Sequence, residues 1–249
     1  MPAAQNLLEA CGEQPDEALF YAARAEFFQQ DPTRFAQNME RARSLDPTQW
    51  RYAQAMIEWH IQQKQAAAAL KLAEAYLQKH PKNYYLGLLN AKALLLNAQY
   101  SQGISFMQQL QVLPNEGATT GRGVWKETNL MQALQNIKNQ QYEKALSNIR
   151  DARLWPENLG VGKPYPEDID ERLEDFLEAF SLERLGKNLE AKNKYAQARQ
   201  WKAQAPGATA NDLLLKFWPN RGALRQALLS DKSRDSENGR VILEWCKVR

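Results

Sequence analysis

The chain has 249 residues and a net charge of +3, from 32 basic and 29 acidic side chains. This near balance, with no basic stripe interleaved with aromatic residues, argues against nucleic acid as a partner. No run approaches 18 consecutive apolar residues, so the sequence predicts no membrane-spanning helix. Residues 1–18 lack the basic start and apolar centre of a signal peptide. The compartment stays open, with the cytoplasm favoured.

Two kinds of helical stripe alternate along the chain. In the first kind, apolar residues stand 15, 12 and 8 positions before a mostly small anchor residue; in the second, they stand 4 and 7 positions after it. The anchors are Phe35, Ala69, Gly103, Ala145 and Ala191. Short breaks between the stripes fall at 31–32, 64–65, 97–98, 139–140 and 186–187. The pattern predicts five pairs of antiparallel helices.

The first three anchors are 34 residues apart, a period typical of helix–turn–helix arrays. Together with the later alanine and the closing proline, such as Ala42 and Pro47, they resemble the tetratricopeptide repeat (TPR). The resemblance covers roughly residues 16–205, lacks the family's Trp–Leu–Gly start, and has glycine five positions before the anchor only at Gly186. It implies an all-α fold: a TPR-like α-solenoid of about five helix–turn–helix units with a C-terminal capping segment.

The next two steps between anchors are longer, at 42 and 46 residues. The residues beyond a 34-residue period are rich in glycine and threonine in the first step and in proline and glycine in the second. We therefore predict inserted loops at 114–124 and 155–169. The expected organisation is a helical repeat array over 1–205 and a C-terminal cap or tail over 206–249. Thr209 and Asn220 are candidate helix caps within that tail.

The stretch from Tyr142 to Ala191 contains Tyr-Glu-Lys-Ala, then Pro-Glu-Asn-Leu-Gly-x-Gly-Lys-Pro, then Leu-Gly-x-x-x-Glu-Ala. In these segments it resembles the C-terminal repeats of large bacterial, Bacteroidetes-like proteins that have an uncharacterised β-rich N-terminal region. The resemblance implies that the chain is a C-terminal fragment with an added Met1. It also implies a carbohydrate-related parent protein, with no established activity for this piece.

Residues suited to metal binding are sparse. Cys11 and Cys246 lie near opposite ends of the chain, which suits unpaired thiols. No cysteine or histidine stands at ligand spacing from His60 or His80, so we predict no metal site.

Catalytic and cofactor motifs are also absent from the sequence. Gly160 and Gly162 precede Lys163-Pro164 and lack the third glycine and Lys-Ser/Thr pair of phosphate-binding loops. The acidic run at 167–171 precedes a predicted helix, whose positive N-terminus it would stabilise. We predict no cofactor, no catalytic residue and a protein that is not an enzyme.

The first helices of stacked pairs line the concave side of a solenoid. Positions 18, 14, 11 and 7 before each anchor should face that groove, and they mix charged and aromatic residues. The predicted groove residues are Tyr21, Arg24, Phe28, Arg51, Glu58, Gln62, Tyr85, Lys92, Lys138 and Arg184. The second loop adds three candidate contacts, Asn158, Lys163 and Tyr165, because long loops often carry function.

Such a mixed surface suits a peptide or protein partner. The main hypothesis is therefore a protein–protein interaction or scaffold module that binds its partner in the groove. The alternative is a helical accessory region of a larger, carbohydrate-related multidomain enzyme, whose partner is another domain of the longer chain. The oligomeric state stays open.

Overall fold

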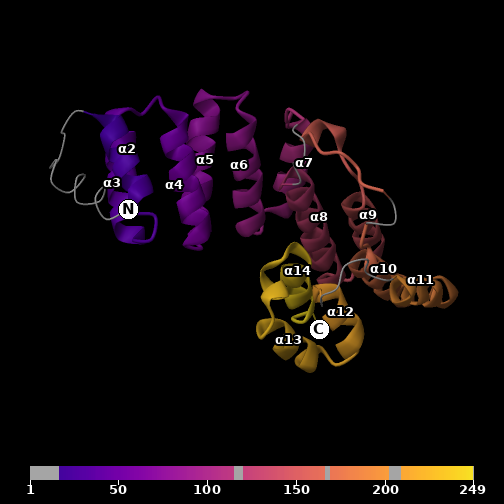
Figure 1. The fold of residues 1–249 in the computed structure, drawn as a ribbon. Coiled ribbons are helices and arrows are strands. Elements are labelled where there is room, and N and C mark those ends of the chain that lie inside the picture. Colours follow the sequence, from indigo (N-terminus) through magenta and orange to yellow (C-terminus); the bar gives the residue numbers. More distant parts are fainter. Residues whose placement is uncertain (1–16, 115–119, 166–168, 202–208, 249) are drawn as a thin grey trace. The chain divides into compact units, whose positions relative to one another are not determined.

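A computed structural model describes residues 17–114, 120–165, 169–201 and 209–248. Within these ranges the chain is helical and has no strand, which confirms the predicted all-α class (Figure 1). The chain divides into two compact units, Met1–Ala98 (unit 1) and Gln99–Arg249 (unit 2). The division falls inside the third predicted helix pair, whereas the sequence predicted one array over 1–205.

Unit 1 is built from helices that follow one another in sequence and pack as neighbours. Its described helices are α2 (Ala18–Phe27), α3 (Pro32–Leu45), α4 (Trp50–Gln62), α5 (Ala66–Lys79) and α6 (Tyr84–Leu96). Each packs on the next, and α4 also contacts α6. Tyr21, Phe35, Met39 and Met56 form a buried core between the first three of these helices. Phe35 and Met39 stand at predicted stripe positions, whereas Tyr21 and Met56 do not.

The turn between the two helices of a pair has the same backbone conformation in four places. Each turn has three residues, and the middle one is left-handed with φ between 57° and 76°: Lys64, Ala98, Gln140 and Gly186. These residues are 34, 42 and 46 positions apart, the same steps as the anchors. In three of the turns the next amide donates to the carbonyl five residues earlier, as Gln65 does to His60 at 2.8 Å. This bond satisfies a carbonyl that the helix end leaves open.

Removing glycine from one of these turns and introducing it into another should change the free energy of unfolding in opposite directions. Holding a residue with a Cβ in the left-handed conformation costs roughly 1–2 kcal/mol. Glycine avoids this cost, but it also makes the unfolded chain more flexible, which offsets part of the gain in stability. No atom lies within 4 Å of a Cβ built at Gly186, so the backbone alone decides. We expect Gly186→Ala to destabilise the protein by about 1 kcal/mol and Gln140→Gly to stabilise it by up to about 1 kcal/mol. Urea denaturation measures both, and changes of the same sign would contradict this explanation.

The turn between α2 and α3 is longer than the others. It comprises four residues, 28–31, and Asp31 caps α3 by accepting from the amides of Thr33 and Arg34 at 3.1 and 3.0 Å. One extra residue rotates the faces of α2 by about 100° relative to the alignment of the other pairs. Ala22 therefore takes the buried small-residue position, and Ala23, which the sequence placed there, is exposed.

Unit 2 contains the later helix pairs and the C-terminal helices. Its described helices are α7 (Tyr100–Gln109), α8 (Thr120–Lys138), α9 (Tyr142–Ala152), η1 (Glu157–Leu159), α10 (Arg172–Arg184), α11 (Asn188–Gln200), α12 (Ala210–Phe217), α13 (Arg221–Leu229), η3 (Lys232–Asp235) and α14 (Glu237–Trp245). The predicted caps are confirmed: Thr209 forms a capping box with Asp212 at α12, and Asn220 accepts from the amide of Ala223 at α13.

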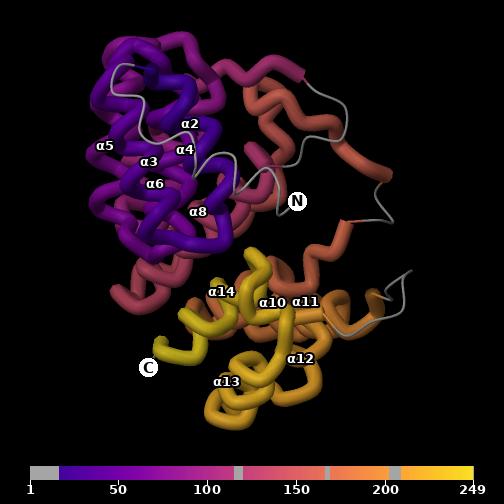
Figure 2. Tube along the Cα trace, turned by 60° about the vertical axis from the view of Figure 1, so that its left-hand side comes forward, coloured from indigo at the N-terminus to yellow at the C-terminus, as the bar shows by residue number. Residues whose placement is uncertain are grey.

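The C-terminal helices share one core with α8 and α10, as their position beside α10 in Figure 2 suggests. Phe176 of α10, Leu228 of α13 and Trp245 of α14 are all buried in this cluster. An ion pair adds to it, because Arg240 of α14 donates through Nε and Nη2 to the two carboxylate oxygens of buried Glu127 on α8, both at 2.6 Å. Helices α12, α13 and α14 thus contribute buried side chains to the core of unit 2.

The loop predicted over 114–124 ends earlier than expected, because α8 begins at Thr120. Gly121, Arg122 and Gly123 are helical and buried. A Cβ added at Gly123 would lie 1.9 Å from a carboxylate oxygen of Glu237. The Glu237 carboxylate of α14 thus lies against this first turn, and α8 packs on α14 where the weak helix propensity of glycine predicted a loop.

Candidate functional site

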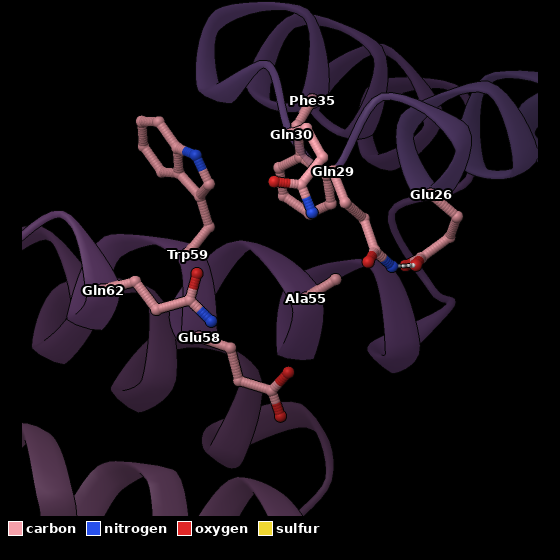
Figure 3. A pocket seen from close by; sticks show the side chains of 8 residues that line it. All are labelled: Glu26, Gln29, Gln30, Phe35, Ala55, Glu58, Trp59 and Gln62. Carbon is pink, nitrogen blue, oxygen red and sulfur yellow. Dashed lines mark hydrogen bonds between the residues drawn. The ribbon is translucent and has the colours of Figure 1, made fainter.

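A hollow opens on unit 1 between the end of α2, the start of α3 and the C-terminal half of α4 (Figure 3). Its volume is about 350 Å³. The residues that line it, and that define the α2/α4 hollow below, are Glu26, Gln29, Gln30, Phe35, Ala55, Glu58, Trp59 and Gln62.

The α4 wall of the hollow follows from helical spacing. Arg51, Glu58 and Gln62 are separated by seven and four residues, so they lie on one face of α4. Glu58 and Gln62, both predicted groove residues, line the hollow and are exposed. Ala55 lies one turn before Glu58, where its small side chain leaves the space open (Figure 3). Gln54 donates to the Glu58 carboxylate at 2.9 Å.

The α2 wall differs from the prediction. Tyr21 and Phe28, expected to face the groove, are 4% and 5% exposed. Arg41 of α3 lies 5.8 Å from the ring of Tyr21, and Arg34 lies 3.7 Å from that of Phe28. The four-residue turn explains this correction, since its extra residue turns these side chains inward. Arg24 lies on the same helix and is rotated in the same way, and its side chain is half-buried.

Three residues that the sequence pattern did not predict take the place of these side chains. Glu26, Gln29 and Gln30 stand at the end of α2 and in the turn, and all three are exposed and line the hollow. The side-chain amide of Gln29 donates to the Glu26 carboxylate. Residues 28–31 contain neither glycine nor asparagine, so Asp31-Pro32 marked where α3 starts but not the residue at which α2 ends.

The lining of the hollow combines two carboxylates, three side-chain amides and two aromatic rings. Glu26 and Glu58 come from opposite walls, and no lysine, arginine or histidine is among the lining residues. The indole nitrogen of Trp59 is buried and has no hydrogen-bond partner within the described residues. Such a set can accept hydrogen bonds from a cation and exchange hydrogen bonds with a peptide backbone.

An aromatic shelf lies at the N-terminal ends of α4 and α6, formed by Trp50, Tyr84 and Tyr85. The rings of Trp50 and Tyr85 are stacked at 6.0 Å, and those of Tyr84 and Tyr85 at 4.3 Å. Tyr85 is 47% exposed, and the guanidinium of Arg51 lies 4.7 Å from the ring of Trp50. One predicted groove residue, Tyr85, belongs to this shelf, and a second, Arg51, contacts it. A third, Lys92, is half-buried on α6.

The remaining predicted groove residues belong to unit 2. Lys138 ends α8 and is exposed. Arg184 ends α10 and is exposed, with its guanidinium 5.0 Å from the ring of Phe180. Neither residue lines the α2/α4 hollow.

The loop residues of unit 2 divide into one internal contact and two exposed side chains. The side-chain amide of Asn158 donates to the carbonyls of Met107 and Leu110 at 2.9 and 2.7 Å, which corrects its prediction as a partner contact. Its amide satisfies carbonyls at the end of α7, and this fixes the loop on the helix. Lys163 and Tyr165 are exposed, and Tyr165 is 74% exposed.

A second hollow, of about 450 Å³, lies in unit 2 beside a cluster of charges. Lys163, Asp175 and Trp201 are among its lining residues. Arg153 pairs with Asp175 at 2.8 Å, with Glu178 at 2.7 Å and with Glu171 at 3.3 Å. Burial raises the pKa of Asp175 and of Glu171, and the positive charge of Arg153 opposes both rises. The charged side chains of this cluster pair with one another, which favours a structural role for the cluster.

Comparison with known proteins adds no relative. Among the described residues, no helix has the length and apolar character to cross a membrane. Within the same ranges, no group of three or more histidine, cysteine, aspartate or glutamate residues is placed to hold a metal ion. No model of a known protein family and no curated protein sequence matches the chain.

Proposed function

We propose that this chain is a tetratricopeptide-type interaction module that binds a peptide or protein segment on the open face of the first helices of unit 1. The role is binding rather than catalysis. Support for the repeat comes from the left-handed turns at Lys64, Ala98, Gln140 and Gly186, which recur with the spacing of the anchors. Successive helix pairs that share one turn geometry and follow the anchor spacing are expected of a helix–turn–helix array.

The observation that carries the binding proposal is the α2/α4 hollow. It is a concave site on the face that the spacing of Arg51, Glu58 and Gln62 selects, and its polar side chains can bond to a peptide backbone. The aromatic shelf at Trp50 and Tyr85 adjoins the same face of α4 and offers exposed rings. Tyrosine and tryptophan at such positions are frequent anchors of binding energy.

A selection from a fully degenerate 12-residue peptide library on the intact chain tests the proposal. We expect bound peptides whose affinity falls at least tenfold in the double variant Glu58→Ala/Gln62→Ala, because both lining side chains are removed. The matched control is Glu74→Ala/Gln78→Ala, which removes two exposed residues of the same types and spacing from α5. Fluorescence anisotropy measures the affinities and circular dichroism verifies folding. Equal losses in both variants, or no bound peptide at all, would refute the proposal.

A further inference from the structure

We infer that the α2/α4 hollow takes the side chain of a lysine or arginine from the bound segment. The inference rests on the proposed function and specifies the chemistry of its partner. Its first support is the charge of the lining. Glu26 of α2 and Glu58 of α4 both line the hollow, and no cationic side chain is among its lining residues.

The known contacts of the two carboxylates are with neutral groups. Glu26 accepts from the amide of Gln29, and Glu58 accepts from the amide of Gln54 at 2.9 Å. Within the described residues neither carboxylate forms an ion pair, whereas Arg43 and Glu40 on α3 do. A carboxylate has about four acceptor positions, so both retain capacity for a further donor. A guanidinium or an ammonium group supplies donors and neutralises the like charges.

The rest of the lining suits the stem of such a side chain. Trp59 lines the hollow and is half-buried, so its ring offers aromatic surface against which the methylene groups of lysine or arginine can pack. A cation near the face of an indole gains further attraction. The amide oxygens of Gln30 and Gln62 can accept from a guanidinium. The volume of about 350 Å³ is sufficient for one such side chain.

The test uses the peptides selected on the intact chain. Each arginine of a bound peptide is replaced in turn by citrulline, which is neutral and of similar shape, and each lysine by norleucine. We expect one such replacement to weaken binding about fivefold, the effect of one partly exposed ion pair. In the Glu58→Gln variant the same replacement should change affinity less than about twofold. Glu74→Gln, an exposed glutamate on α5, serves as the matched control and should behave as the unmodified chain.

Each outcome of this experiment decides the inference. Coupling between the basic residue and Glu58, absent with Glu74, supports it. Selected peptides without lysine or arginine, or an equal loss on the Glu58→Gln variant, overturn it. In that case the proposed function still stands if binding depends on the Glu58/Gln62 pair. If no peptide binds at all, the inference and the proposed function fall together.

Discussion

Replacing Trp245 by alanine should lower the free energy of unfolding of unit 2 by roughly 3–5 kcal/mol, the range for a buried tryptophan. The indole of Trp245 has no exposed surface. Its ring meets that of Phe180 edge to face at 4.5 Å and that of Phe176 at 5.6 Å, and the guanidinium of Arg221 lies 4.3 Å from it. Three helices therefore lose a shared contact, and the remaining cavity cannot be filled without moving them.

Urea denaturation and amide hydrogen exchange would measure this loss. Exchange should accelerate in α10 and in α14 together, because both pack on the same ring. Leu229→Ala is the control, since Leu229 of α13 is 41% exposed and its truncation should cost far less. A small effect of Trp245→Ala, comparable with that of the control, would mean that the core of unit 2 does not depend on the C-terminal helices.

The second large effect is expected at Arg153, whose replacement by methionine should destabilise the protein by about 3 kcal/mol at pH 7. Its guanidinium forms ion pairs with three carboxylates, and the side chain of one of them, Asp175, is only 6% exposed. Lys194 also contacts Asp175, at 3.3 Å, and can compensate for only part of the loss. Methionine preserves the length and packing of the side chain, so the lost charge dominates the measured change.

The destabilisation by Arg153→Met should depend on pH. Burial raises the pKa of Asp175 and of Glu171, and removal of Arg153 should raise both further. A carboxyl whose pKa is higher in the folded than in the unfolded chain contributes less stability as the pH rises through the folded value. The loss is therefore full at pH 7 and shrinks as the pH falls through the raised pKa values, because protonated carboxyls need no cation.

Urea denaturation of both proteins at pH 7, 6 and 5 would show this trend as a narrowing difference in unfolding free energy. Arg150→Met provides the control, because Arg150 is exposed on the same helix, α9. Its effect should stay small at every pH. A difference between the unmodified chain and Arg153→Met that is constant with pH would contradict the role of Arg153 as the counterion of these carboxylates.

Helix positions were largely predictable because local patterns determine them. The breaks predicted at 64–65, 97–98, 139–140 and 186–187 fall within the three-residue turns of the structure. Residues of one helical face recur every three or four positions, and that periodicity needs no knowledge of distant contacts. The cap at Thr209 was predictable for the same reason, since its hydroxyl bonds to an amide three residues away.

The site was predictable on one wall only. Glu58 and Gln62 line the α2/α4 hollow, as helical spacing on α4 requires. On α2 one additional turn residue rotated Tyr21 and Phe28 into the core and brought Glu26 and Gln29 to the hollow. A one-residue difference in a turn is invisible to a periodic pattern that starts anew in each helix, yet it shifts a whole helical face by about 100°.

The sequence by itself therefore determined the helical class, the helix pairs and the face of α4, because these depend on residues within a turn or two of each other. Tertiary structure decided what depends on distant partners. Gly121 and Gly123 are helical although their type predicted a loop, and the helix that contains them packs on α14. The ion pair of Arg240 with Glu127 joins residues 113 positions apart, and no local pattern marks it. Packing between such distant segments outweighs local propensity, because burial and ion pairing contribute more free energy than the conformational preference of a single residue.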